Sequence, residues 1–260
     1  MTATTADDRR VIGRQIRAID RNPALATSWN AALATPCIVA AVPLPQSIRS
    51  AMPNGVRDQP TLRAMALALG LIPPRPMHSP AEANVLAGLS GQANRVVEIG
   101  VYEGSSAVMF CHAMVPAAEL HLIDPFVDES GSALPPNWST VPTAARMAVW
   151  RAARHDGPKT RWHIARSQDV GPRWDGGEVD LVFIDGDHSA QACREDWDVW
   201  HPHVRHGGAV AFHDARLDRP GGTGSPGPTG VVDELFRSPA PPEGWSIADE
   251  VDTLVVVKRD

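Results

Sequence analysis

The segment from Arg95 to Phe126 constrains the fold of this chain more than any other part of its sequence. It begins with an apolar, partly β-branched run at 96–99, which has the length of a buried strand. Gly100 and Gly104 then bracket a short loop that opens a helix expected over 105–114, and glycines there let the backbone approach a ligand closely. The order strand, glycine loop, helix is typical of a ligand-binding α/β unit.

A second strand is expected over 120–123, and it ends in Asp124. Since α/β folds bind their ligands at the carboxyl edge of a parallel sheet, Asp124 is placed to accept hydrogen bonds from ribose hydroxyls. The loop reads E-I-G-x-x-x-G and lacks the G-x-G-x-x-G spacing that seats a dinucleotide pyrophosphate. Glu98 would repel a diphosphate, so the pattern favours a cationic nucleoside ligand over a nicotinamide cofactor. An ordinary βαβ unit with a glycine turn is the structural alternative.

The rest of the chain continues the alternation of strands and helices. Five further strands are expected at 161–164, 179–184, 209–212, 245–250 and 253–258, with helices at 144–154 and 190–200. This order predicts a Rossmann-like, doubly wound sheet of seven strands, mostly parallel with an antiparallel last strand. The proline- and glycine-rich segment 220–230 is expected to be a flexible loop, either a surface linker or a lid over the site.

The N-terminal third has a different pattern, with proline-interrupted helical segments at 7–20 and 61–69. We expect an N-terminal helical cap over residues 1–78 and a catalytic domain over 79–260. The sequence Ser79-Pro-Ala-Glu82 is a capping box with proline at the first helical position, so a helix should begin there.

The charge and composition of the chain limit the classes of partner that it could bind. A net charge of -6 and the absence of a Lys/Arg-rich run argue against a nucleic-acid partner. No apolar stretch approaches the roughly 18 residues that span a bilayer, and the polar N-terminus does not resemble a signal peptide, so we expect no membrane partner and a cytoplasmic location. The three cysteines are far apart in the sequence, which favours reduced thiols.

Ionisable residues follow two strands that should be neighbours in the sheet. Asp185, Asp187 and His188 come after the strand 179–184, and His213 and Asp214 come after the strand 209–212. Adjacent strand ends lie about 5 Å apart, so these side chains should converge. Apposed carboxylates repel unless a cation neutralises them, and oxygen ligands with one imidazole suit Mg²⁺ or Mn²⁺. His188 or His213 could instead have a purely structural role.

The loop EIGVYEGSSAV resembles the cofactor loop of the class I methyltransferases, and of the catechol O-methyltransferases in particular. The resemblance covers roughly 79–260 and implies S-adenosylmethionine as methyl donor. It also matches the Arg166–Asp169 segment to a Ser-Gln pair that holds the adenine ring. The donor contacts it implies are Glu98, Gly100, Tyr102, Gly104, Ser105, Asp124, Ser167, Gln168 and Asp185.

In the metal-dependent branch of this family, the resemblance places metal ligands at Asp185, His213 and Asp214. The catechol enzymes have Asp-Asn where this chain has His213-Asp214, which leaves open whether His213 binds metal. A catalytic lysine of those enzymes corresponds to His188, which can accept a proton near neutral pH. The segments IDGDHS and GGAVAFHD resemble most closely the methyltransferases of sugar and antibiotic pathways.

Together these features predict an enzyme that transfers a methyl group from S-adenosylmethionine to a hydroxyl of a sugar or glycosylated metabolite, with a divalent metal. The alternatives are a catechol or phenol O-methyltransferase and a non-catalytic S-adenosylmethionine-binding protein. We expect a homodimer as the commonest oligomer. Trp138 could stack on the acceptor, whereas the pair Trp197 and Trp200 is expected to pack in the core. The histidines His201, His203 and His206 are expected in a solvated turn.

Overall fold

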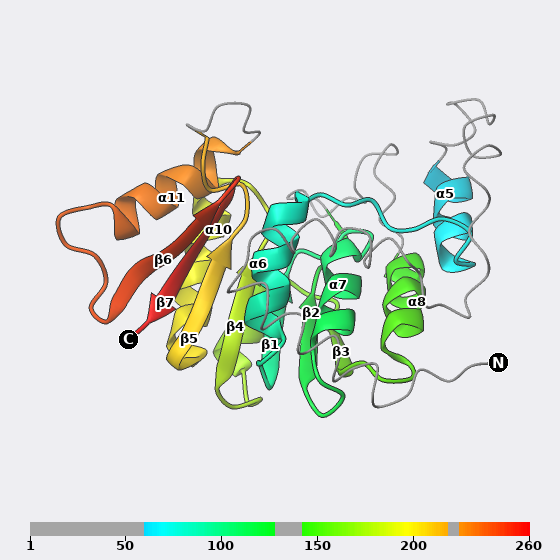
Figure 1. Cartoon of the computed structure of the whole chain (residues 1–260). Coiled ribbons are helices and arrows are strands. Elements are labelled where there is room, and N and C mark those ends of the chain that lie inside the picture. The colour runs from blue at the N-terminus through cyan, green and yellow to red at the C-terminus, as the bar shows by residue number, and fades with distance from the viewer. Residues whose placement is uncertain (1–59, 128–141, 218–223) are drawn as a thin grey trace, which may run out of the picture. The chain divides into compact units, whose positions relative to one another are not determined.

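A seven-stranded sheet forms the centre of the protein, in the order β3-β2-β1-β4-β5-β7-β6 (Figure 1). The computed structural model describes residues 60–127, 142–217 and 224–260. Strands β1 to β5 are parallel, and β7 runs antiparallel to both β5 and β6. The predicted doubly wound sheet with one antiparallel strand is therefore confirmed. The strands are β1 Arg95–Ile99, β2 Glu119–Ile123, β3 Lys159–His163, β4 Val179–Ile184, β5 Val204–Phe212, β6 Trp245–Val251 and β7 Leu254–Arg259.

Helices cover both faces of the sheet, as Figure 1 shows. The front face carries α6 (Pro80–Ser90), α7 (Ser105–Ala113) and α8 (Pro142–Ala153), and the other face carries α10 (Ala190–Trp200) and α11 (Pro226–Phe236). Short elements link them: α9 (Ser167–Val170), η2 (Gly171–Arg173) and η3 (His201–His203). Side chains alternate along a strand, so each strand contributes residues to two hydrophobic cores, one on each face of the sheet. In β2, Leu120 and Leu122 belong to the core on the front face, and Ile123 belongs to the second core on the other face. Trp197 and Trp200 are buried in the second core, as predicted.

The predicted start of α6 is confirmed in atomic detail. The backbone N–H of Glu82 donates to Ser79 Oγ at 3.2 Å, and the backbone N–H of Ser79 donates to Glu82 Oε2 at 2.7 Å. These two bonds satisfy donors that a helix N-terminus would otherwise leave unpaired. Glu82 is nevertheless buried, and its other oxygen accepts hydrogen bonds from the backbone N–H and the hydroxyl of Thr253, both at 2.7 Å. The cap thereby joins α6 to the turn before β7.

Helix α5 (Pro60–Ala68) packs on α8 through Ala64 and Leu67. The Arg151 guanidinium of α8 donates to the carbonyls of Ala68, at 2.6 Å, and Leu67, which closes the C-terminal end of α5. The helix predicted at 61–69 is thus present. The expected helix at 7–20 and Trp138 lie outside the described residues, and the helical cap over 1–78 stays a prediction.

The prediction of a flexible loop at 220–230 is wrong for residues 226–230. The segment 220–230 was expected to be a flexible loop, but Pro226–Phe236 forms α11. Proline in the first turn of a helix costs little because that N–H has no intrahelical partner. The apolar residues that follow, Val231, Val232, Leu235 and Phe236, are buried in the second core, and this burial stabilises the helix despite its glycines.

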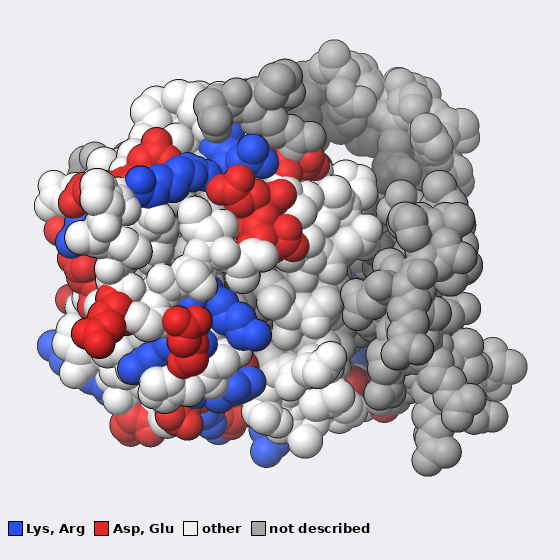
Figure 2. Space-filling model, turned by 60° about the vertical axis from the view of Figure 1, so that its left-hand side comes forward, with Lys and Arg blue, Asp and Glu red and all other residues white. Residues whose placement is uncertain are grey.

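Basic and acidic side chains alternate on the face shown in Figure 2, and the described part of that face has no continuous patch of one sign. Among the described residues, no helix has both the length and the apolar character needed to cross a bilayer. The expected lack of nucleic-acid partners and the cytoplasmic location stay predictions.

Candidate active site

The structure brings the predicted metal-binding residues together where β4 and β5 end. Ile184 and Phe212 are register partners, so Asp185 and His213 leave the sheet side by side. His213 Nδ1 lies 2.9 Å from Asp185 Oδ1 and 3.4 Å from Asp214 Oδ2. Asp214 has a φ of +51°, in the left-handed region, and this turn directs its carboxylate back toward Asp185 and His213. Two carboxylates therefore face one buried imidazole.

His213 is also approached from its other side. Its Nε2 lies 3.5 Å from Glu82 Oε2, and the side chains of both residues are 3% exposed. Burial alone would lower the pKa of His213, but Asp185, Asp214 and Glu82 raise it to about 12. Burial would likewise raise the pKa of Glu82, yet the contact with His213 and the hydrogen bonds from Ser79 and Thr253 lower it to about 2. A protonated His213 thus offsets part of the negative charge of three surrounding carboxylates.

Neither ring nitrogen of His213 has a hydrogen-bond partner of good geometry among the described residues, although carboxylate oxygens lie within 3.5 Å. An unsatisfied buried nitrogen beside two convergent carboxylates fits a cation site as well as it fits an ion pair. Asp185, His188 and Asp214 each offer a ligand atom, and these atoms lie within 4.8 Å of one another. Carboxylate oxygens with one imidazole suit Mg²⁺ or Mn²⁺, so this donor set fits the predicted metal, although its imidazole is His188 and not the predicted His213.

His188 lies at the rim of this cluster. Its Nε2 is 3.2 Å from Asp214 Oδ2, and its side chain is 46% exposed. The hydrogen bond to Asp214 raises the pKa of His188 above the usual histidine value. The neighbouring Asp187, whose role the sequence left open, accepts a hydrogen bond from the backbone N–H of Ser189 at 2.7 Å, just before α10. His188 is therefore accessible and oriented by a carboxylate, as a general base would be.

The glycine loop lies directly beside these strand ends. A Cβ on Gly100 would lie 2.5 Å from the Asp185 carbonyl carbon and 2.7 Å from Gly186 Cα, and Gly100 has a φ of +87°. A Cβ on Gly104 would lie 3.2 Å from Val149 Cγ2 of α8. The sequence predicted that these glycines give room to a ligand. In the structure, they let β1 contact the end of β4 and let α7 pack on α8.

Glu98, the acid of the loop motif, is fully buried. Its Oε1 accepts a hydrogen bond from Ser106 Oγ, while its Oε2 has no partner among the described residues. Burial raises the pKa of Glu98 well above its usual value. An unpaired carboxylate oxygen at this position would be satisfied by an ammonium group or another donor, so the loop fits a ligand with a positive charge.

Asp124 fixes the shape of the same loop. Its Oδ2 accepts hydrogen bonds from the backbone N–H groups of Val101, at 2.8 Å, and Tyr102, at 2.9 Å. Its Oδ1 accepts one from the backbone N–H of Phe126 at 2.6 Å. Tyr102 has a φ of +52°, and its hydroxyl accepts a hydrogen bond from Arg75 at 3.1 Å. Asp124 therefore holds the turn between β1 and α7, and Ser105 stands at the first position of α7.

Ser167 and Gln168, the predicted adenine contacts, start α9 next to β3 and α10. Both donate to Asp196 Oδ1, Gln168 from its Nε2 at 3.1 Å and Ser167 from its Oγ. Asp196 is 3% exposed, and burial raises its pKa to about 7. The buried carboxyl group of Asp196 therefore positions both residues, and the sequence analysis did not identify it.

Two further acids were also missed. Glu82 was recognised only as part of a capping box, and its contact with His213 bridges residues that are far apart in sequence. Glu103 of the glycine loop is 1% exposed and accepts two hydrogen bonds of 2.6 Å from the Arg63 guanidinium of α5, plus one from the backbone N–H of Arg75 at 2.8 Å. The position of Glu103 directly before Gly104 was the only feature of the sequence that could have marked it as part of the loop structure.

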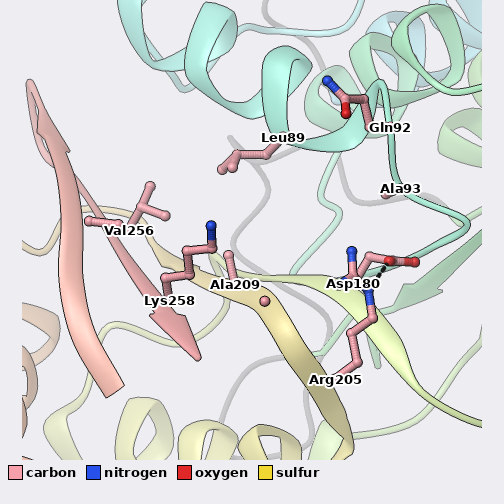
Figure 3. Close-up of a pocket in the computed structure, with 10 residues that line it drawn as sticks. Leu89, Gln92, Ala93, Asp180, Arg205, Ala209, Val256 and Lys258 are labelled. Atoms are coloured by element: carbon pink, nitrogen blue, oxygen red, sulfur yellow. Dashed lines mark hydrogen bonds and ion pairs between the residues drawn. The ribbon is translucent and has the colours of Figure 1, made fainter. Parts of the chain in front are cut away.

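A small hollow of about 140 Å³ lies at the opposite edge of the sheet (Figure 3). Asp180 and Arg205, two of its lining residues, form an ion pair with an Nε–Oδ1 distance of 2.5 Å. Asp180 Oδ2 also accepts from the backbone N–H groups of Asn94 and Arg95, at 2.9 and 2.8 Å. These contacts fasten the starts of β1, β4 and β5, so we assign this region a structural role. His201, His203 and His206 do not share one solvated turn as predicted, because the first two lie in η3 and the third lies in β5. None of them belongs to a metal cluster among the described residues.

Comparisons with known proteins agree with this geometry. A family model described as a methyltransferase domain matches residues 97–215. A cofactor-bound structure of Rv0187 from MTB is 18% identical, with a TM-score of 0.55 over 80% of this chain and 98% of that chain. An O-methyltransferase from Bacillus cereus in complex with SAH is 17% identical, with a TM-score of 0.52 over 82% and 96% of the two chains.

The O-methyltransferase TomG from Streptomyces achromogenes, in complex with SAM, is 19% identical, with a TM-score of 0.50 over 82% of this chain and 94% of that chain. Comparison with curated proteins finds no match. The family model and the fold together show that this chain carries a methyltransferase domain with the class I architecture, and the predicted enzyme class is confirmed.

Proposed function

We propose that the protein transfers a methyl group from S-adenosylmethionine to a hydroxyl group, with a divalent cation bound at the ends of β4 and β5. The observation that carries this proposal is the convergence of Asp185 and Asp214 on His213 Nδ1, at 2.9 and 3.4 Å. Structural neighbours described as O-methyltransferases bound to SAM or SAH support the donor and the reaction type.

In this proposal, Asp185, His213 and Asp214 would hold the cation, and its charge would take the place of the proton that the carboxylates otherwise favour on His213. The cation would lower the pKa of a coordinated hydroxyl. Glu98 is assigned the contact with the ammonium group of the donor, which would give its buried Oε2 the hydrogen-bond partner that the described residues do not supply. Asp124 keeps the loop in shape and borders the ribose, and Ser167 and Gln168, held by Asp196, border the adenine ring.

His188 is the proposed base. Its exposed ring can reach an acceptor, and its contact with Asp214 orients one nitrogen toward the carboxylate and leaves the other for the acceptor proton. An alternative role as metal ligand follows from the closeness of its Nε2 to Asp185 and Asp214. The two roles differ in one measurable respect: His188→Ala abolishes cation binding only if His188 is a ligand.

The acceptor is proposed to be a sugar or glycosylated metabolite, with catechols and phenols as the alternative class. The test measures transfer of labelled methyl groups to a panel of saccharides and diphenols, with Mg²⁺ and with EDTA. We expect activity on one class that EDTA and Asp185→Asn abolish, while Asp198→Asn, on the exposed side of α10, retains it. Donor binding without transfer to any acceptor would favour a non-catalytic binding protein, and transfer in EDTA would exclude the metal role.

A further inference from the structure

A cleft of about 660 Å³ lies on the sheet face that α10 and α11 cover, at the edge formed by β2 and β3. The connection from β3 to β4 crosses this face through α9, which has only 4 residues, and the short η2. So short a connection leaves the side chains of β2 and β3 on this face partly uncovered. A volume of this size suits a small-molecule ligand.

The floor of the cleft contains a buried imidazole with an unsatisfied nitrogen. His121 is 4% exposed, and its Nδ1 lies 3.1 Å from His163 Nε2. Its Nε2 is buried and has no hydrogen-bond partner among the described residues, although Glu119 Oε2 lies 3.8 Å from it. Burial, followed by the repulsion from His163, lowers the pKa of His121 to about 4, so the ring is neutral at pH 7.

The charged groups of the floor leave an excess of positive charge. Glu119 accepts hydrogen bonds from Arg95 at one oxygen and from Arg161 at the other, both with Nη2–O distances of 3.0 Å. One carboxylate thus faces two guanidinium groups, and these two bonds hold the pKa of Glu119 near 2. The second positive charge disfavours a metal cation at His121 and favours an anion. Arg161 is 57% exposed, so its guanidinium remains accessible.

A flat aromatic wall borders the same space. The Trp174 ring lies 4.6 Å from the His121 ring, centroid to centroid, at 70°. Its Nε1–H is already satisfied by the Gly177 carbonyl at 2.7 Å, so the indole contributes ring surface and no further donor. The exposed charges at the mouth, Asp169, Arg173 and Asp175, have mixed signs and contribute little to selectivity.

We propose that this cleft is a second binding site, for a small molecule that combines a carboxylate with a flat aromatic ring. The carboxylate pairs with the exposed guanidinium of Arg161, and the ring lies against Trp174 and the imidazole of His163. This inference is independent of the proposed methyl transfer, because none of these residues is assigned to that reaction.

The test is calorimetric titration with 2-naphthoate and two matched probes. The amide 2-naphthamide has the same shape without the charge, and decahydronaphthalene-2-carboxylate has the charge without the flat ring. We expect 2-naphthoate to bind about two- to fivefold more tightly than either probe, because an exposed ion pair and an aromatic contact each contribute an effect of this size. Equal affinity for all three probes, or no binding of 2-naphthoate, would overturn the proposal.

Two variants locate the binding. Arg161→Gln should weaken 2-naphthoate binding about two- to fivefold, as expected for an exposed ion pair. Arg146→Gln is the control, because it removes the same charge from α8, where Arg146 lies over Trp162 on the front face. Histidine ring NMR should show shifts at His121 and His163 on binding and none at His188 or His213. Shifts confined to His188 and His213, or equal loss in both arginine variants, would contradict a separate site.

Discussion

Gly100→Ala tests how closely β1 and β4 must approach to form the site. The new Cβ would lie 2.5 Å from the Asp185 carbonyl carbon and 2.7 Å from Gly186 Cα, which are backbone atoms with little freedom to move. The φ of +87° adds strain for any residue with a side chain. Strain in this region costs about 1–3 kcal/mol, and overpacking costs about 1–3 kcal/mol more. We therefore expect the free energy of unfolding to fall by about 2–6 kcal/mol.

Equilibrium unfolding in urea measures this loss, with Gly88→Ala as the matched control. Gly88 lies inside α6, and a Cβ there would meet nothing within 4 Å. Alanine should stabilise that helix by about 0.5–1 kcal/mol. The Gly100 variant should also bind S-adenosylhomocysteine more weakly, because the clash displaces Asp185 and the loop together. Wild-type stability and affinity in Gly100→Ala would refute the inferred contact between β1 and β4.

Three other predictions concern buried groups. Glu103→Gln should lower the free energy of unfolding by about 3 kcal/mol in urea titration, because the Arg63 guanidinium loses its counter-charge, and a loss below about 1 kcal/mol would contradict this. Asp196 has a folded pKa of about 7, above its unfolded value, so its ionisation should destabilise the protein as pH rises from about 4 to 7. Asp196→Asn should remove that part of the decline from unfolding measured across pH, and parallel profiles would exclude it. Cys111 and Cys193 are buried with raised pKa values, to about 12 for Cys193, so mass spectrometry should find iodoacetamide on them only after unfolding, and labelling of the native protein would contradict their burial.

Strands β1, β2, β4 and β7 were predictable because each is a short, largely apolar run. Strand β5 begins at residue 204, before the apolar run at 209–212 from which it was predicted. The hairpin of β6 and β7 and the capping box at Ser79 were also correctly placed, since both are encoded within a few neighbouring residues. The helix α11 was missed because its stability comes from tertiary burial of Val231, Val232, Leu235 and Phe236, which outweighs the local preference of its prolines and glycines for a loop.

In the candidate site, too, some features follow from the local sequence and others depend on tertiary packing. The meeting of Asp185, His213 and Asp214 follows from parallel strand order, which the sequence pattern indicates. The contact of Glu82 with His213 depends on how α6 packs over the sheet, and no local pattern encodes it. The glycines were recognised as special, but the structure was needed to show that neighbouring protein atoms also require their lack of a side chain.

The central claim is that the strand-end acids bind a divalent cation, and electron paramagnetic resonance of Mn²⁺ titrated into the protein tests it most directly. We expect one Mn²⁺ per chain at saturation, competition by Mg²⁺, and at least about tenfold weaker binding in Asp185→Asn and Asp214→Asn but not in Asp198→Asn. An unchanged free Mn²⁺ signal at all protein concentrations, or equal binding in all three variants, would contradict it.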